Sequence, residues 1–263
     1  MNKKMLIKTL TGLAMAAIAI PCFLFGSYPM AVLLGIIMLL ISHEISNLFK
    51  KENTWVMAAL CFAALVVLTM TGLDRFAATS ACWLIVLFIL ELVDETTTMD
   101  AVAYTYAITM LVAFALRGIA SMYNAPGENG FLTMLYVGLA CFLCDTGAYF
   151  FGVFMGKHKL IPRVSPNKTW EGAIGGFATG CVCSMAYAFA FLKYMPREFI
   201  VIASILLPIA AQVGDLGFSS IKRHFGIKDF GNLIPGHGGV LDRVDSIIFC
   251  LGVFQALRLM MRF

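Results

Sequence analysis

The densest group of charged side chains lies between Ser219 and Asp245, where the chain reads SSIKRHFGIKDFGNLIPGHGGVLDRVD. Glycines let a backbone adopt positive φ and approach a ligand closely, as loops that bind phosphate require. Lysine and arginine supply positive charge to phosphate oxygens. We therefore expect this stretch to bind a phosphate-bearing ligand through Gly236, Gly238, Gly239, Lys222, Arg223, Lys228 and Arg243. A solvated loop on the basic side of a membrane would explain the basic residues, but not the glycines or the aspartates.

Two aspartates in and before this stretch have the chemistry of metal ligands. Gln212, Asp215 and Ser219 are spaced so that they share one face of a helix. A carboxylate within the bilayer costs about 2.5 to 3.5 kcal/mol on insertion scales, so it should meet a cation or water. Asp215 and Asp242, with nucleotide phosphates and waters, suit Mg²⁺, which seldom occupies an all-protein cage. The alternative for Asp215 is a structural hydrogen bond or ion pair within the helical bundle.

A second polar group precedes the first along the chain. Asp145 interrupts an apolar run, and residues 157–172 then read KHKLIPRVSPNKTWEG. Ser165, Lys168 and Glu171 gather just before the next apolar run, and we predict that they contact the substrate together with Asp145. Capping of a helix by Glu171 and anchoring at the membrane interface by Trp170 would explain those two residues alone.

The elements that position these residues are expected to be membrane helices. Of the 263 residues, 60% are hydrophobic and 13% charged, and the mean hydropathy of +0.88 excludes water as the main solvent. Nine apolar runs are each about long enough to cross roughly 30 Å of hydrocarbon as a helix. The sequence predicts an all-α, polytopic membrane helical bundle with about nine transmembrane helices, at residues 6–25, 29–46, 54–72, 76–93, 101–120, 131–155, 171–192, 198–220 and 244–263.

We expect residues 1–130 to provide scaffold and lipid access, and residues 131–263 to form the catalytic region with two cytoplasmic loops. Nine spans place thirteen of the nineteen Lys and Arg residues on the side of the N-terminus. By the positive-inside rule, the N-terminus and the active site are then cytoplasmic, in a protein of the cell (inner) membrane. The net charge of +4 includes no block of like charges, which argues against a nucleic-acid partner.

Other motifs give less information about function. The eight cysteines lie in or at the ends of apolar runs, and we interpret them as small buried hydrophobes. His43 and Glu44 are followed by Asn47 where the zinc motif HExxH needs its second histidine, so a zinc protease is excluded. His237 is expected either to contact phosphate or to bond to the loop backbone.

The stretch from Ser219 to Asp245 resembles the signature of the phosphatidate cytidylyltransferases. The matching residues are Ser219, Lys222, Arg223, Lys228, Asp229, Pro235, His237, Gly238, Gly239, Asp242, Arg243 and Asp245. The Asp145 helix and the SPNKTWEG stretch are similar to the family too, so the resemblance covers roughly the second half of the chain. The first five apolar runs match only in being hydrophobic.

This resemblance implies that CTP and phosphatidate react to give CDP-diacylglycerol and pyrophosphate. It assigns Mg²⁺ to Asp215 and Asp242, and leaves open a second, monovalent cation and a homodimer. Such a transfer needs positioning and charge neutralisation rather than a covalent intermediate, so Lys222, Arg223 and Lys168 would act with the two aspartates. The residues expected to bind substrate are Asp145, Ser165, Lys168, Glu171, Ser219, Lys228, His237, Gly238, Gly239, Arg243 and Asp245.

Two other functions compete with this one. A CTP-dependent lipid kinase of the polyprenol or phytol type would use similar residues but transfer the γ-phosphate, and the DRVD stretch with PGHGG argues against it. An ion-coupled transporter would use Asp145 and Asp215 as a relay. Transporters of that kind tend to contain internal repeats, which this sequence lacks.

Overall fold

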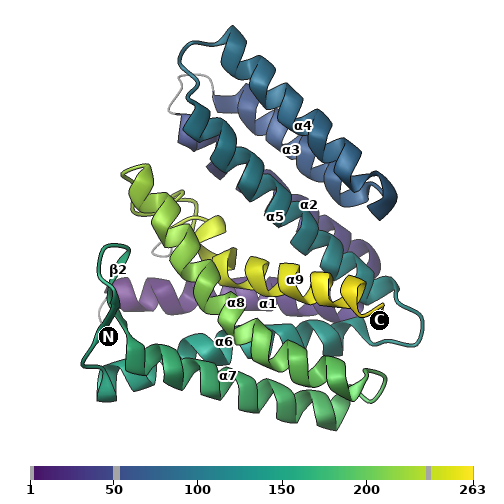
Figure 1. Cartoon of the computed structure of the whole chain (residues 1–263), viewed down its shortest axis with the longest axis vertical. Helices are drawn as coiled ribbons and strands as arrows, with labels where there is room; N and C mark the ends of the chain where they lie inside the picture. Colours follow the sequence, from purple (N-terminus) through teal and green to yellow (C-terminus); the bar gives the residue numbers. More distant parts are fainter. Residues whose placement is uncertain (1–2, 50–53, 235–237, 263) are drawn as a thin grey trace. The chain divides into compact units, whose positions relative to one another are not determined.

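The computed structural model describes residues 3–49, 54–234 and 238–262 (Figure 1). Within them, each of the nine apolar runs forms an α-helix, as the sequence predicts. The helices are α1 (Lys3–Phe25), α2 (Ser27–Ser46), α3 (Thr54–Met70), α4 (Leu73–Val93), α5 (Met99–Asn124), α6 (Gly130–Met155), α7 (Trp170–Phe191), α8 (Arg197–His224) and α9 (Leu241–Met260). A 3₁₀ turn, Asn47–Phe49, extends α2.

Six of the described helices are long and apolar enough to cross a membrane: α2 with its 3₁₀ extension, α4, α5, α6, α7 and α8. The chain is therefore an integral membrane protein built as a helical bundle. Two further apolar helical segments, Leu10–Phe25 and Thr54–Met70, are shorter. Helix α9 carries four charged residues, Asp242, Arg243, Asp245 and Arg258, which lower its hydropathy.

The chain divides into two compact units. Unit 1 comprises Met1–Arg117 and Ile227–Arg243, and unit 2 comprises Gly118–Gly226 and Val244–Phe263. The polar stretch from Ser219 to Asp245 is thus shared: its central part belongs to unit 1 and its two ends to unit 2. The functional division predicted at residue 130 concerns activity and stays a prediction.

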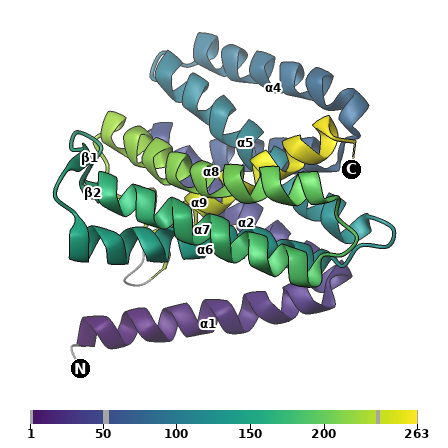
Figure 2. The ribbon, with the colours of Figure 1, turned by 60° about the horizontal axis from the view of Figure 1, so that its bottom comes forward.

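In unit 2, helices α6 and α7 lie side by side (Figures 1 and 2). Their contact is lined by glycines: a Cβ atom on Gly176 would lie 2.5 Å from the Cys144 carbonyl oxygen, and one on Gly180 would lie 2.9 Å from that of Ala140. Small residues allow such close approach, and in a membrane this packing replaces the hydrophobic drive that lipid removes. Helix α8 packs against the same pair.

Polar contacts hold these helices in register. The Tyr136 hydroxyl lies 2.8 Å from the Ser204 hydroxyl, which joins α6 to α8. The Cys144 thiol donates to the Pro208 carbonyl at 3.5 Å. All eight cysteines are free, and five of them, Cys61, Cys141, Cys144, Cys181 and Cys250, are buried. For those five, the prediction of small buried hydrophobes is confirmed, whereas Cys82 and Cys183 are exposed.

Unit 1 uses similar contacts. The Arg117 guanidinium donates to the carbonyl groups of Leu68, Thr69 and Thr71, which have no helical partner at the end of α3. The Trp83 indole donates to the Thr109 hydroxyl at 2.8 Å and joins α4 to α5.

A short antiparallel hairpin precedes α7, within the stretch predicted to be a cytoplasmic loop. It pairs β1 (Lys159–Ile161) with β2 (Ser165–Thr169), which aligns Lys159 with Thr169 and Ile161 with Ser165. Val164 in its turn is buried. The hairpin fixes the direction in which the residues before α7 point.

Candidate active site

A charged cluster in unit 2 brings together residues from four elements. The Lys168 ammonium on β2 pairs with the Asp215 carboxylate on α8, and each side chain keeps roughly a third of its surface exposed, 29% and 32%. The Ser219 hydroxyl donates to the same carboxylate at 3.4 Å. Asp145 on α6 interacts electrostatically with Lys168, with Asp215 and with Asp245 on α9. The structure thus gathers five residues predicted for the site.

The composition of this cluster sets its electrostatics. The Asp145 carboxylate interacts with the negative charges of Asp215 and Asp245 and with the positive charge of Lys168. Among the described residues, no three or more His, Cys, Asp or Glu side chains are arranged to hold a metal ion by themselves. A divalent ion here would therefore depend on ligands from phosphate or water, as Mg²⁺ commonly does.

Lys222 and Arg223 lie on helix α8 rather than in a loop, because α8 continues to His224. Lys222 follows Ser219 by three positions, so the two lie on neighbouring positions of one face. Lys222 is buried and Arg223 is exposed. The two basic side chains, predicted to act together, therefore lie in different surroundings.

Gln212, predicted to share the face of Asp215 and Ser219, binds α7. Its amide nitrogen donates to the Ala173 carbonyl at 2.9 Å and contacts the Cys144 thiol at 3.4 Å. Gln212 therefore joins helices α7 and α8, one turn before Asp215.

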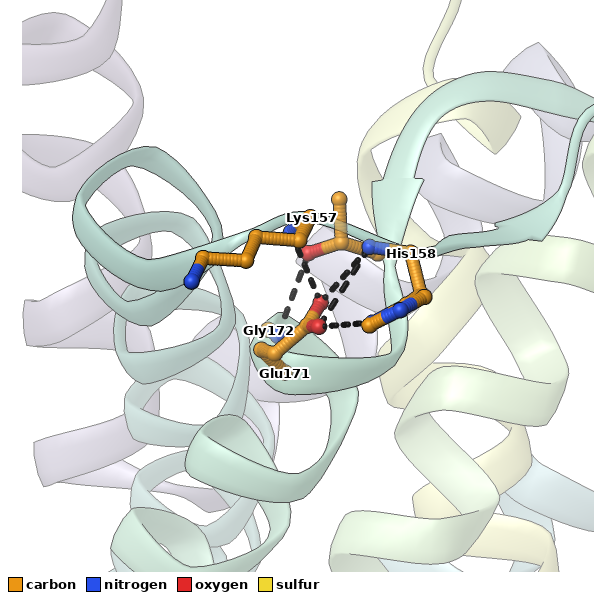
Figure 3. Close-up of polar contacts among 5 residues, drawn as sticks. Lys157, His158, Glu171 and Gly172 are labelled. Atoms are coloured by element: carbon orange, nitrogen blue, oxygen red, sulfur yellow. Dashed lines mark hydrogen bonds and ion pairs between the residues drawn. The ribbon is translucent and has the colours of Figure 1, made fainter.

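Glu171 closes the hairpin (Figure 3). Its carboxylate accepts hydrogen bonds from the backbone amides of Lys157, at 3.1 Å, and His158, at 3.2 Å, and lies 2.6 Å from the His158 Nδ1 atom. The cap of α7 is Thr169, whose hydroxyl accepts from the Gly172 amide at 3.2 Å. Glu171 is therefore not the N-cap residue itself; from the first turn of α7, its carboxylate ties the start of the hairpin to the start of that helix.

In unit 1, Asp242 binds the backbone of the glycine-rich segment, residues 231–241. Its Oδ2 atom accepts from the backbone amides of Phe230, at 2.8 Å, and Gly239, at 3.0 Å, and the side chain is buried. Gly238 has a φ of +85°, which disfavours any residue with a side chain. Lys228 and Arg243 are exposed. Pro235, Gly236 and His237 lie outside the described residues, so the prediction for His237 stays a prediction.

Glu44 contacts this segment, and its role was not predicted from the sequence. It lies on α2, is fully buried, and accepts backbone hydrogen bonds from Val240 and Leu241. The signal was present, because an ionisable residue within an apolar helix of a membrane protein calls for a partner.

The donor chemistry fits Mg²⁺ at both predicted ligands. Asp215 already holds the cationic group of Lys168, and Asp242 presents a carboxylate fixed by two amides. Hard carboxylate oxygens of this kind are what Mg²⁺ prefers. Asp215 belongs to unit 2 and Asp242 to unit 1.

Comparison with known proteins extends the resemblance to the first half of the chain. Residues 6–261 match the model of the "Cytidylyltransferase family". A phosphatidate cytidylyltransferase of Staphylococcus haemolyticus is 33% identical over 264 residues, covering 98% of this chain and 100% of that protein. One from Staphylococcus aureus strain COL is 32% identical over 96% of this chain and 98% of its own. One from Staphylococcus saprophyticus is 41% identical over 152 residues, 56% of each chain.

Proposed function

We propose that this chain, which belongs to the cytidylyltransferase family, transfers the cytidylyl group of CTP to phosphatidate and so makes CDP-diacylglycerol and pyrophosphate for phospholipid biosynthesis. The observation that carries this proposal is the similarity to phosphatidate cytidylyltransferases over nearly the whole chain. The charged cluster of Lys168, Asp215 and Asp145 agrees with it, because transfer between phosphates needs fixed charges near the reacting groups.

The reaction proceeds by direct displacement. An oxygen of the phosphatidate phosphate forms a bond to the α-phosphorus of CTP, and the bond from that phosphorus to the oxygen that bridges to the β-phosphate breaks. Pyrophosphate leaves with the bridging oxygen and its electron pair. Lys168, Lys222 and Arg223 hold and neutralise the phosphate oxygens, which lowers the barrier without a covalent enzyme intermediate.

We also propose that Asp215 and Asp242 hold Mg²⁺, a role that rests on their residue type and on the family resemblance. When bound, the ion neutralises phosphate charge. Asp145 and Asp245 reinforce the negative potential that attracts a cation to Asp215. Ser165, Ser219, Lys228, His237, Gly238, Gly239 and Arg243 are proposed to contact substrate.

The proposed topology has nine membrane crossings, with the N-terminus and the reacting groups at the cytoplasmic face. The excess of Lys and Arg on that side supports it. Phosphatidate then enters from the inner leaflet and CTP from the cytosol. The family resemblance further suggests a homodimer, which chemical cross-linking of the purified protein would test.

Radiolabelled CTP tests the activity directly. Purified protein in phosphatidate-containing micelles with Mg²⁺ is expected to transfer label to lipid from α-³²P-CTP and none from γ-³²P-CTP. The alternative lipid kinase would give the reverse pattern. Absence of lipid labelling from α-³²P-CTP in protein that elutes as a single folded species would overturn the proposal.

A further inference from the structure

Glu44 is the most deeply buried carboxylate among the described residues that has no role in the proposed reaction. It lies on α2, in a segment apolar enough to cross a membrane, and its exposed fraction is 0%. A charged group in such a place is retained only when specific partners compensate it. Its partners therefore indicate what it does.

Those partners are backbone amides at the start of α9. Oε1 of Glu44 accepts from the Val240 amide at 2.7 Å, and Oε2 accepts from the Leu241 amide at 2.7 Å. Both bonds are short and buried, and they join positions nearly two hundred residues apart in the chain. Both partners belong to unit 1. The two oxygens thus fix the point where the glycine-rich segment ends and α9 begins.

Two glycines of this segment are explained by the same carboxylate. A Cβ atom on Gly239 would lie 2.6 Å from Glu44 Oε1, and one on Gly231 would lie 3.0 Å from it. A side chain at Gly239 would therefore collide with Glu44, and one at Gly231 would be tightly packed against it. Gly239, predicted from the sequence to allow close approach of a phosphate, also allows the close approach of this carboxylate.

The contacts also restrict how the segment can bind phosphate. The amides of Val240 and Leu241 are taken by Glu44, and the Gly239 amide by Asp242. The N-terminus of α9 is thus occupied by carboxylates and does not offer these amides to an anion. The basic side chains of Lys228 and Arg243, on either side of these amides, are exposed and can meet phosphate oxygens.

We propose that Glu44 is a positioning residue for the CTP site, which acts by holding Gly231 and residues 239–241 beside helix α2. This inference rests on the proposed function. In this proposal the N-terminal half of the chain contributes to the reaction, because the contacts of Glu44 on α2 position Asp242, Lys228 and Arg243. Glu44 itself touches neither substrate nor the reacting atoms.

Glu44→Gln tests these contacts with little change in volume. Its amide oxygen still accepts one backbone hydrogen bond, but its NH₂ group faces the second donor. Ile45→Val is the matched control, because Ile45 is the next residue on α2, is equally buried, and loses one methyl group. Size-exclusion elution and thermal stability in detergent establish that both variants fold.

The first readout is independent of catalysis. In Glu44→Gln, exchange of the Val240 and Leu241 amides with deuterium is expected to accelerate about tenfold or more, as loss of a buried hydrogen bond predicts, and in Ile45→Val it should not. Unchanged exchange at both amides would overturn the contacts themselves. This result stands whether or not the wild-type protein uses CTP, so it separates failure of this inference from failure of the proposed function.

The second readout is kinetic. Glu44→Gln is expected to raise KM for CTP about tenfold while KM for phosphatidate stays within about twofold, since only the nucleotide-binding segment moves. Equal changes in KM for CTP and for phosphatidate, or no change in KM for CTP, would show that the role of Glu44 is only structural. In a double-mutant cycle, Gly239→Ala should raise KM for CTP in the wild-type background and add little to Glu44→Ala, because the colliding oxygen is gone. Additive effects would contradict the contact.

Discussion

The ammonium of Lys168 in the hairpin before α7 pairs with the carboxylate of Asp215 in α8. This pair joins the two polar regions that the sequence analysis singled out separately. It also provides both a cation for phosphate and an anion for a metal at one place in unit 2. The first two predictions concern these two residues.

Lys168→Met removes the charge and keeps the length of the side chain. We expect kcat/KM for cytidylyl transfer to fall at least about a hundredfold, the usual cost of deleting a group that stabilises transition-state charge. Stability should change little, because the pair is partly exposed. Lys159→Met, at an exposed position of the same hairpin, is the control and should retain activity. A Lys168→Met enzyme as active as the control would exclude a catalytic role for Lys168.

Removal of the metal should abolish turnover. EDTA is expected to stop label transfer from α-³²P-CTP, and added Mg²⁺ to restore it. Because a ligand that binds the folded state stabilises it, Mg²⁺ with CTP should also raise the melting temperature of the wild-type protein, and Asp215→Asn should lose most of that shift. Full activity without a divalent cation would contradict the proposed metal role.

Asp242→Asn should cost stability as well as activity. One oxygen of its carboxylate accepts two buried backbone amides, and asparagine would offer them a neutral oxygen in place of a charged one. We expect a loss of about 1 to 3 kcal/mol in unfolding free energy, because hydrogen bonds to charged groups are stronger than those between neutral groups. Asp215→Asn, which removes a partly exposed ion pair, should unfold close to the wild type under the same denaturant titration. Equal stability of the two variants would show that Asp242 does not organise its segment.

Glu171→Gln should loosen the hairpin. Two backbone amides and the His158 ring bind the Glu171 carboxylate, so the amides of Lys157 and His158 should exchange faster with deuterium. Glu198→Gln is the matched control, since Glu198 is also an acidic residue in the first turn of a helix and is exposed. We expect kcat/KM to fall less than in Lys168→Met. A fall as large as that would instead support the direct substrate contact predicted from the sequence.

Gly176→Ala should weaken the packing of α6 on α7. The added methyl group would meet the Cys144 carbonyl oxygen and the Ala148 Cβ atom, at 2.5 and 2.7 Å, so unfolding free energy should fall by about 1 to 3 kcal/mol. Gly35→Ala is the control: it is a helical glycine with open space at its Cβ, and alanine favours the helix. Thermal unfolding in one detergent compares the two. A Gly176→Ala protein as stable as Gly35→Ala would show that the helices can separate at no cost.

Hydropathy was enough to predict the nine α-helices of the described residues, because a helix satisfies the backbone of an apolar run internally. It could not predict that α8 continues to His224, since the last turns of that helix are polar. It also missed the hairpin, whose strands are three and five residues long and contain a proline. Charge and spacing indicated Asp145, Lys168 and Asp215, which the fold brings together. Glu44 escaped because its partners lie 196 and 197 positions away, a distance that no local pattern reveals.

The polar signature crosses from unit 2 into unit 1 after Gly226 and returns after Arg243. A chimera of two relatives that exchanges only residues 1–117 would therefore combine Glu44 from one protein with residues 227–243 from the other. To preserve native contacts, such an exchange has to carry residues 227–243 along with the N-terminal helices. Unit 1 is thus a structural module encoded by two separate stretches of the chain.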